Sequence, residues 1–312
     1  TIMNRRDAIK AMGLGGFGLG LASVAGRAEP KDSAAAPVLR VAHLTDIHLD
    51  EKNHAPEKFA RQLRHLMALP NRPDFILNGG DTIMDAFAVK DRSRNDAQWK
   101  LWSEVFNAEC DLEIKHCIGN HDIWGFGPPD DPLHGKHYAV EKMGLTAPYY
   151  SFDRGGWHFV VLDSVTVEAN GDCIGRLDET QFEWLTADLA ATPASTPVLV
   201  MSHYPLLSAT VFYPENAQPD SNWMVPGAWM HIDFNRISDL FARHPSVRVC
   251  LSGHMHQIDH VVFNDVTYLC NGACCGGWWG NDTYIRSKAG YAVLNLYADG
   301  NVTRDFHHPA WA

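Results

Sequence analysis

LEIKHCIGNHD (residues 112–122) joins an apolar, strand-like stretch to a run of side chains that can ligate metals. Other strand-like stretches end in the same way, with Asp or His close behind the last apolar residues. These segments are VLRVAHLTDIH (38–48), FILNGGD (75–81), PVLVMSH (197–203) and VRVCLSGHMH (247–256). Because the carboxyl ends of parallel strands meet at one edge of a sheet, where loops diverge and ligands bind, the segments predict a metal site at such an edge.

Strand-like and helix-like stretches alternate around these segments. Residues 57–69 and 95–108 carry apolar side chains at helical spacing, and Trp99, Trp102 and Phe106 fall on one face of the second stretch. Alternation of this kind predicts a largely parallel sheet with helices packed outside it. Strands that are apolar on both sides fit this arrangement, because helices cover both faces of such a sheet.

The second half of the domain has a different pattern. Residues 149–163 are expected to form a hairpin around Gly155-Gly156, and 177–190 a helix. Asp178 is its expected N-cap, with Gln181 completing a capping box. A further helix is expected at 234–244, followed by antiparallel strands at 258–264, 266–271, 290–298 and 302–308.

The first thirty residues stand apart from the rest of the chain. Arg5-Arg6 precede a Gly/Ala/Leu-rich run over 11–25, which resembles a twin-arginine export signal. The run is too short and too rich in Gly for a stable membrane span, and an amphipathic helix is the alternative. The resemblance implies export, to the periplasm. The expected organisation is a signal, a linker and one catalytic domain, at residues 1–30, 31–37 and 38–312.

The overall composition excludes some classes of partner. The 312 residues are 46% hydrophobic and 20% charged, which is ordinary for a globular protein, and the net charge is −11. Such acidity argues against nucleic acid as the main partner. Seven cysteines show no CxxC spacing, so most are expected to be small buried hydrophobes, with a disulfide left open. The oligomeric state is not predicted.

The donors at the strand ends outnumber what one ion needs. They are two carboxylates, four imidazoles and one carboxamide, from Asp46, His48, Asp81, Asn120, His203, His254 and His256. A set of this size suits two ions. Nitrogen and oxygen donors without thiolate favour Mn, Fe, Zn or Co over Ca²⁺.

These motifs together resemble the calcineurin-like metallophosphoesterase family, including its cyclic-nucleotide phosphodiesterases. The resemblance rests on DIH at 46–48, GD at 80–81, GNHD at 119–122, His203 and GHMH at 253–256. It extends over nearly the whole of residues 38–312. It implies a four-layer α-β-β-α sandwich with two mixed sheets between helices.

The resemblance also implies a division of the donors between two ions. One ion is expected on Asp46, His48 and His256, the other on Asn120, His203 and His254, with Asp81 bridging them. A water shared by two ions about 3.5–4 Å apart loses a proton near neutral pH, so it can attack phosphorus in line.

His121 matches the family's catalytic histidine, which contacts the phosphate or protonates the leaving group. Asp122 has two interpretations, because it can orient the ring of His121 or support the turn. The family often places an acid three residues after the bridging Asp, where this chain has Met84. Asp85 is therefore left out of the predicted site, and Met84 also argues against a tyrosinate–iron centre.

The sequence therefore predicts a binuclear metal-dependent phosphoesterase that hydrolyses small phosphate esters, with diesters as the expected class. The alternatives are a phosphomonoesterase of the same fold and a non-catalytic metal-binding module. The module is disfavoured because none of the seven expected ligands is missing.

Aromatic residues and histidines outside the motifs have less specific interpretations. Tryptophans in the loops near the donors can either form a wall on which a flat group stacks or brace the loops. They are Trp124, Trp223, Trp229, Trp278 and Trp279. Histidines in strand or helix patterns are expected to be partly buried packing residues: His43, His65, His116, His158 and His260.

Overall fold

The computed structural model describes residues 36–214 and 221–311 of the chain. The export signal predicted at 1–30 and most of the predicted linker lie outside the described residues. Among the described residues, no helix is both long and apolar enough to cross a membrane.

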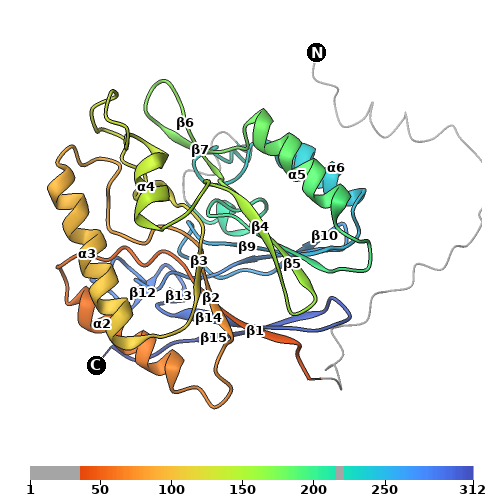
Figure 1. The fold of residues 1–312 in the computed structure, drawn as a ribbon, viewed down its shortest axis with the longest axis horizontal. Coiled ribbons are helices and arrows are strands. Elements are labelled where there is room, and N and C mark those ends of the chain that lie inside the picture. Colours follow the sequence, from red (N-terminus) through yellow and green to blue (C-terminus); the bar gives the residue numbers. More distant parts are fainter. Residues whose placement is uncertain (1–35, 215–220, 312) are drawn as a thin grey trace, which may run out of the picture. The chain divides into compact units, whose positions relative to one another are not determined.

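The first sheet has five strands in the order β15-β14-β1-β2-β3 (Figure 1). Strands β1, β2 and β3 are parallel, as the alternating pattern predicts, and β14 lies antiparallel to both β1 and β15. The bounds are β1 (Leu39–Leu44), β2 (Phe75–Asn78), β3 (Ile114–His116), β14 (Tyr291–Leu296) and β15 (Val302–His307).

The second sheet has six strands in the order β10-β11-β9-β8-β5-β4. Its bounds are β4 (Tyr150–Arg154), β5 (Trp157–Val161), β8 (Val198–Met201), β9 (Val247–Ser252), β10 (Val261–Phe263) and β11 (Val266–Cys270). The hairpin around Gly155-Gly156 is confirmed as β4 and β5. The predicted antiparallel pairing of the last strands is confirmed for β10 with β11 and for β14 with β15, while β11 also pairs in parallel with β9. Strand β10 turns the chain back first, so β11 enters the sheet in the direction of β9.

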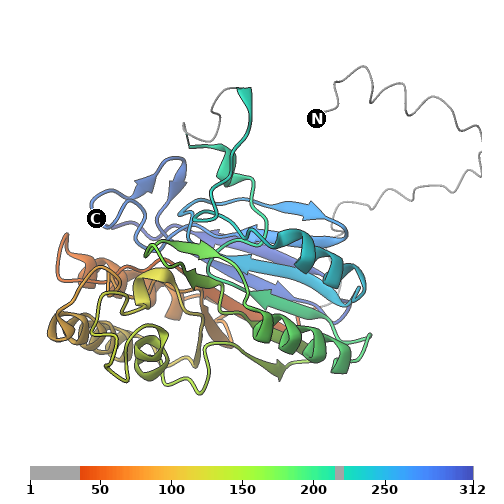
Figure 2. The same ribbon diagram turned by 90° about the horizontal axis from the view of Figure 1, so that it is seen from above.

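Two pairs of helices cover the outer faces of the sheets (Figures 1 and 2). Helices α2 (Ala55–Met67) and α3 (Arg92–Glu109) pack on the first sheet, and α5 (Glu179–Ala191) and α6 (Phe234–Ala242) on the second. The predicted face of α3 is confirmed, because its two tryptophans and Phe106 are buried. The smaller elements are α4 (Lys136–Lys142), β6 (Val165–Val167), β7 (Cys173–Gly175), β12 (Thr283–Tyr284) and β13 (Ser287–Lys288), with 3₁₀ turns at Asn120–Asp122 and Thr210–Phe212.

The alternation of side chains along the strands explains the layers. In β1, Leu44 faces the core beneath α2 and α3, whereas Val41 faces the second sheet. There it belongs to the same buried cluster as Phe159 and Leu199 of β5 and β8. A third cluster joins the outer face of the second sheet to α5 and α6. The predicted α-β-β-α sandwich with two mixed sheets is therefore confirmed.

Some local expectations are confirmed and others are wrong. Asp178 does cap α5, accepting from the backbone N–H of Gln181 at 2.7 Å. The capping box is nevertheless incomplete, because the Gln181 amide pairs with the backbone N–H and C=O of Asp163, both at 2.8 Å. His65 and His260, expected to be partly buried, are exposed. All seven cysteines are free, and all but Cys173 are buried.

Candidate metal centre

The seven predicted donors lie together at the carboxyl ends of strands from both sheets. The first sheet supplies the four donors that follow β1, β2 and β3, and the second supplies the three that follow β8 and β9. The centre therefore lies at the edge of the sandwich where these strands end, and both sheets contribute donors to it.

Left-handed backbone places most of these donors. Five of the seven have positive φ: Asp46 (51°), His48 (46°), Asp81 (52°), His254 (68°) and His256 (54°). Non-glycine residues in this region cost about 1–3 kcal/mol each, so such a cluster persists only where the surrounding structure holds it. The first two loops supply part of that support, since the backbone N–H groups of Asp46 and His48 donate to the carbonyls of Gly80 and Asp81 at 3.0 and 2.9 Å.

One group of donor atoms surrounds His48. Its Nε2 is 3.1 Å from Nε2 of His256 and 3.4 Å from Oδ2 of Asp81. Nε2 of His256 is in turn 3.4 Å from Oδ1 of Asp46. Ligands about 2.0–2.2 Å from a tetrahedral ion are separated by about 3.3–3.6 Å, so these atoms have the spacing of a ligand set.

A second group surrounds His203. Its Nε2 is 3.2 Å from Oδ2 of Asp81, 3.2 Å from Oδ1 of Asn120 and 3.3 Å from Nδ1 of His254. Oδ2 of Asp81 therefore faces both groups. The structure brings the donors together in the two sets that the family resemblance implies.

Backbone carbonyls determine which ring nitrogen three of the four imidazoles present to the centre. His203 Nδ1, His254 Nε2 and His256 Nδ1 lie 2.9, 2.7 and 3.2 Å from the carbonyl oxygens of Gly79, Ala228 and Gly276. A carbonyl only accepts, so each of these nitrogens must carry the proton. In the neutral form of all three rings the other nitrogen has the lone pair, and it is the nitrogen inside the donor group. This arrangement is what a metal requires of its imidazole ligands, so the residues present fit two such ions.

The charges of the centre are also suited to cations. Burial lowers the pKa of His254 to about 3 and holds that of His48 well below 6.5, so both rings are neutral. Burial opposes ionisation of Asp81, but His203 and His121 hold its pKa well below 3.8. Burial likewise lowers the pKa of His203, yet the adjacent Asp81 raises it to about 9. Nε2 of His203 would have to lose this proton to become a metal ligand.

His121 lies at the open side of the centre. Its backbone N–H donates to Oδ1 of Asp81 at 2.8 Å, and its Nδ1 donates to the Met84 carbonyl at 2.7 Å. The ring stands edge-on to that of His48, with centroids 4.7 Å apart, and 27% of its side chain is exposed. Nε2 is therefore the nitrogen that can reach a substrate.

Two carboxylates lie near His121, and the structure decides between the two interpretations of the first, Asp122. Asp122 does not orient the ring: it accepts from the backbone N–H groups of Gly119 and Thr82 at 2.9 and 2.8 Å, and so supports the turn. Burial raises its pKa to about 7. Asp85, left out of the predicted site, has its carboxylate 3.9 Å from Nδ1 of His121. No motif identified it, because its position depends on how the loop after Asp81 turns.

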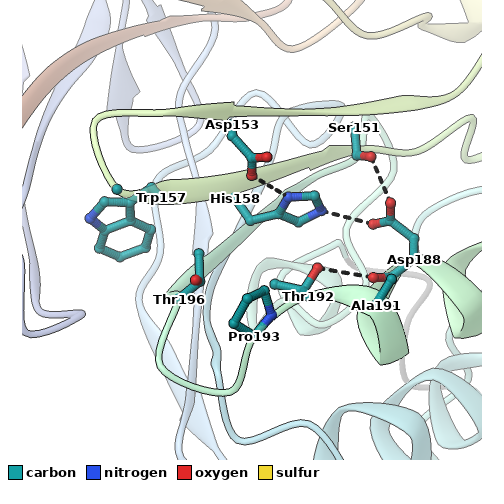
Figure 3. Close-up of a pocket in the computed structure, with 10 residues that line it drawn as sticks. Ser151, Asp153, Trp157, His158, Asp188, Ala191, Thr192, Pro193 and Thr196 are labelled. Atoms are coloured by element: carbon teal, nitrogen blue, oxygen red, sulfur yellow. Dashed lines mark hydrogen bonds and ion pairs between the residues drawn. The ribbon is translucent and has the colours of Figure 1, made fainter.

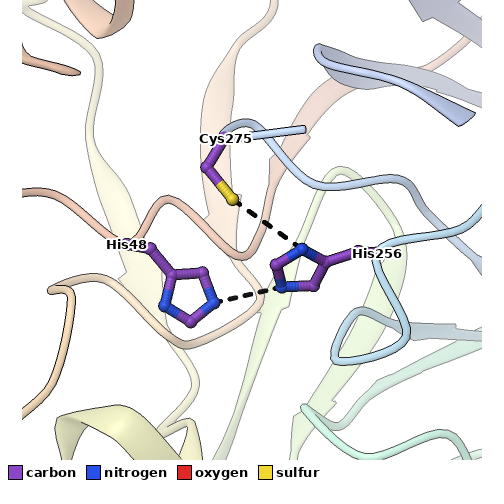
Figure 4. Close-up of side chains that lie close together, drawn as sticks. All are labelled: His48, His256 and Cys275. Carbon is purple, nitrogen blue, oxygen red and sulfur yellow. Dashed lines mark hydrogen bonds between the residues drawn. The ribbon is translucent and has the colours of Figure 1, made fainter. Parts of the chain in front are cut away.

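A cysteine also lies beside the donors (Figure 4). The Cys275 thiol is 3.8 Å from Nδ1 of His256, and His48 is on the other side of that ring. Nδ1 carries the proton that the Gly276 carbonyl accepts, so the sulfur lies behind the ring, outside the donor group. Burial holds the pKa of this thiol well above 9, which disfavours the thiolate. The sequence did not indicate this neighbour, because no spacing relates a Gly-rich loop to the GHMH motif.

The tryptophans divide between the two open interpretations. Trp279 is fully buried and its Nε1–H donates to the Ile47 carbonyl at 2.7 Å, which braces the loop that carries His48. Trp124 is 2% exposed and braces a second loop, since its Nε1–H donates to the Val89 carbonyl. Trp278, in contrast, is 39% exposed and lies against the His48 ring.

A cavity of about 530 Å³ lies away from this centre, between β4, β5 and the end of α5 (Figure 3). His158 lies in it between two carboxylates, 2.7 Å from Asp153 and 2.9 Å from Asp188. Ser151 donates to the other oxygen of Asp188 at 2.7 Å. His158 is at the start of β5, whereas the metal donors follow the ends of strands, so this cavity is not part of the centre.

Comparisons with known proteins agree with this geometry. The profile described as "Calcineurin-like phosphoesterase" matches residues 39–258. A 3',5'-cyclic-nucleotide phosphodiesterase from Nostoc sp. is 26% identical over 283 residues, which are 85% of this chain and 90% of that protein. The 3',5'-cyclic adenosine monophosphate phosphodiesterase of Escherichia coli is 24% identical over 87% of this chain and 90% of its own length. The fold matches that of a dimetal phosphatase from Danio rerio, with a TM-score of 0.62 and 17% identity over 88% of this chain and 97% of that one.

Proposed function

We propose that this chain, which belongs to the calcineurin-like phosphoesterase family, hydrolyses small phosphate diesters at a two-metal centre, with 3',5'-cyclic nucleotides as the favoured substrates. The observation that carries the proposal is the position of Asp81. One oxygen of its carboxylate lies 3.4 Å from His48 and 3.2 Å from His203, and therefore between the two donor groups.

The proposed ligands follow the two groups. Asp46, His48 and His256 would hold one ion, Asn120, His203 and His254 the other, and Asp81 would be shared. When bound, such a pair of ions lowers the pKa of water and neutralises charge on the phosphoryl group. The donor set, without thiolate, fits Mn, Fe, Zn or Co.

His121 is the proposed catalytic residue. Its Nδ1 proton is held on the Met84 carbonyl at 2.7 Å, so a second proton can be carried only on Nε2. This is the proton that can pass to the leaving oxygen as the ester bond breaks. The hydrogen bond from its backbone N–H to Asp81 fixes His121 relative to the proposed metal ligands.

Two observations support a small cyclic diester. Relatives that share most of their length with this chain are named as cyclic-nucleotide phosphodiesterases. The net charge of −11 disfavours a long polyanion such as nucleic acid.

The test compares three substrates on metal-stripped protein resupplied with Mn²⁺: 3',5'-cyclic AMP, bis-p-nitrophenyl phosphate and p-nitrophenyl phosphate. Turnover of both diesters that requires metal and is lost in Asn120→Ala supports the proposal. Turnover of p-nitrophenyl phosphate alone would reject the diesterase and identify a phosphomonoesterase. Turnover of bis-p-nitrophenyl phosphate but not of 3',5'-cyclic AMP would support a phosphodiesterase and reject cyclic nucleotides as its substrates.

We also propose that the chain is exported by the twin-arginine route to the periplasm. The proposal rests on Arg5-Arg6 and the Gly/Ala/Leu-rich run that follows them. The test is cell fractionation of a chain with Arg5→Lys and Arg6→Lys beside the unchanged chain. Periplasmic activity should disappear in the double variant, and equal distribution of the two would reject the route.

A further inference from the structure

The indole of Trp278 lies over the metal donors. Its ring centroid is 4.2 Å from that of His48 and 4.8 Å from that of His256. The ring of His121, the proposed catalytic residue, is 5.7 Å away. Because 39% of Trp278 remains exposed, part of the side chain packs on the donors while part faces solvent beside His121.

The loop holds this ring in one place. Trp278 and Trp279 both have positive φ, at 57° and 61°, a conformation that bulky side chains rarely adopt. Trp279 is buried and anchored to the Ile47 carbonyl, while Lys58 donates to the Trp279 carbonyl at 2.6 Å and Asn53 to the Trp278 carbonyl at 3.3 Å. A side chain fixed in this way loses little conformational freedom when a ligand binds.

Bracing explains Trp279 but not Trp278. A tryptophan that braces a loop is buried and has its N–H satisfied, as Trp279 and Trp124 are. Trp278 instead keeps its large ring partly exposed although its backbone is in an unfavourable region. Strained backbone that presents an exposed group at a reactive centre points to a role in binding. Tyr284 extends this aromatic side, with its ring 5.4 Å from that of His256.

We propose that Trp278 is the platform on which the base of a cyclic nucleotide stacks while its phosphodiester is held at the metal centre. The inference rests on the proposed function and specifies how the substrate is recognised. Stacking uses the face of the ring and needs no base-specific hydrogen bond, so adenine and guanine should both be accepted. Trp278 therefore determines specificity for diesters that carry a flat group.

The first test measures kinetics with 3',5'-cyclic AMP for Trp278→Leu and Trp278→Phe. Loss of one stacked base predicts a KM about 5- to 150-fold higher in Trp278→Leu, with unchanged kcat. Phe should restore part of the loss, because it keeps an aromatic face. The matched control is Trp223→Leu, since Trp223 is 56% exposed and its ring contacts Phe212 rather than the donors. An equal rise of KM in the control and Trp278→Leu would overturn the proposal.

Two further measurements separate this inference from the proposed function. Binding of adenosine 5'-monophosphate by equilibrium dialysis should weaken in Trp278→Leu by the same factor as KM rises, and unchanged binding would overturn the platform. If the unchanged protein cleaves bis-p-nitrophenyl phosphate but no cyclic nucleotide, the proposed substrate class fails and the nucleotide-binding difference alone decides the role of Trp278. Metal content should equal that of the unchanged protein, and its loss in Trp278→Leu would assign Trp278 to packing on His48 instead.

Discussion

The second sheet of this molecule takes part in two clusters of histidine and aspartate, and they differ in what surrounds each imidazole. At the metal centre, the outer nitrogens of His203, His254 and His256 donate to backbone carbonyls, and their inner nitrogens face other donors. At the start of β5, both nitrogens of His158 face carboxylates, from Asp153 and Asp188.

The difference has opposite electrostatic consequences. A carbonyl oxygen holds one proton on the ring and leaves a lone pair, so the imidazole can be a ligand. Two carboxylates favour a proton on each nitrogen, and the hydrogen bond to Asp188, more than that to Asp153, raises the pKa of His158 above 6.5. His158 therefore lies between two carboxylates that favour its charged form, in a cavity away from the metal centre. The partners of a histidine, rather than the size of the neighbouring cavity, determine its chemistry.

Among the substitutions that test this contrast, replacement of Asp81 should have the largest effect on activity. In Asp81→Asn the carboxylate between the two donor groups is lost, and we expect turnover of bis-p-nitrophenyl phosphate to fall on the order of 10⁴-fold or more, with reduced metal content. Asp188→Asn is the matched control, because it changes a carboxylate beside His158 and should leave kcat unchanged. Steady-state kinetics and elemental analysis check both, and an active Asp81→Asn with two ions would contradict the bridging role.

Removing the proposed catalytic imidazole should separate chemistry from metal binding. In His121→Ala we expect kcat to fall by about 10²- to 10³-fold, since proton transfer to the leaving oxygen is lost. Metal content should not change, because His121 is outside the two donor groups. A loss of metal together with activity would show that His121 is a ligand instead.

Removing the Thr45 hydroxyl, which hydrogen-bonds to Asp46, should have a smaller effect, and that effect is on metal affinity. Thr45 donates to Oδ2 of Asp46 at 2.8 Å, and Thr45→Val keeps the shape of the side chain without that hydrogen bond. We expect metal affinity to fall about 10- to 100-fold, measured by competition with a chelator. Equal affinity in the two proteins would show that the backbone N–H of His254, which also donates to Asp46, suffices to orient the carboxylate.

The smallest expected effect is that of replacing His158, and it is on the free energy of unfolding. The folded-state pKa of His158 is raised, so its contribution to the free energy of unfolding is complete below about pH 6.5 and is lost as pH rises through the folded-state value. We expect His158→Gln to lower stability by about 1 kcal/mol at pH 5.5 and by less at pH 9. Urea unfolding across this range tests the sign, and a constant difference between the proteins would reject the charged pair.

Much of the centre could be predicted because its donors are local in sequence. Asp46 and His48, or His254 and His256, are two residues apart, and each pair follows a strand whose apolar pattern is unambiguous. The ends of parallel strands converge at one edge whatever the details of packing, so the motifs alone indicate that distant segments meet.

What could not be predicted depends on how loops turn in space. The same Gly-rich loop places Cys275 behind His256, Trp278 over His48 and Trp279 in the core, although two of these residues are identical and adjacent. Likewise, His158 belongs to an ordinary apolar strand, and only the position of α5 brings Asp188 to its ring. Periodicity carries no information about such contacts, because they join residues with no fixed spacing.

The pairing of β1 with β14 has a consequence for the order of events during synthesis. Leu39 pairs with Leu296, so the ribosome must deliver almost the whole catalytic domain before the strand that leads to Asp46 acquires both of its neighbours. Four of the proposed ligands emerge by Asn120, and the remaining three only from His203 onward. A nascent chain would therefore offer an arriving ion an incomplete ligand set, and loading of the two proposed ions would have to follow synthesis of His256.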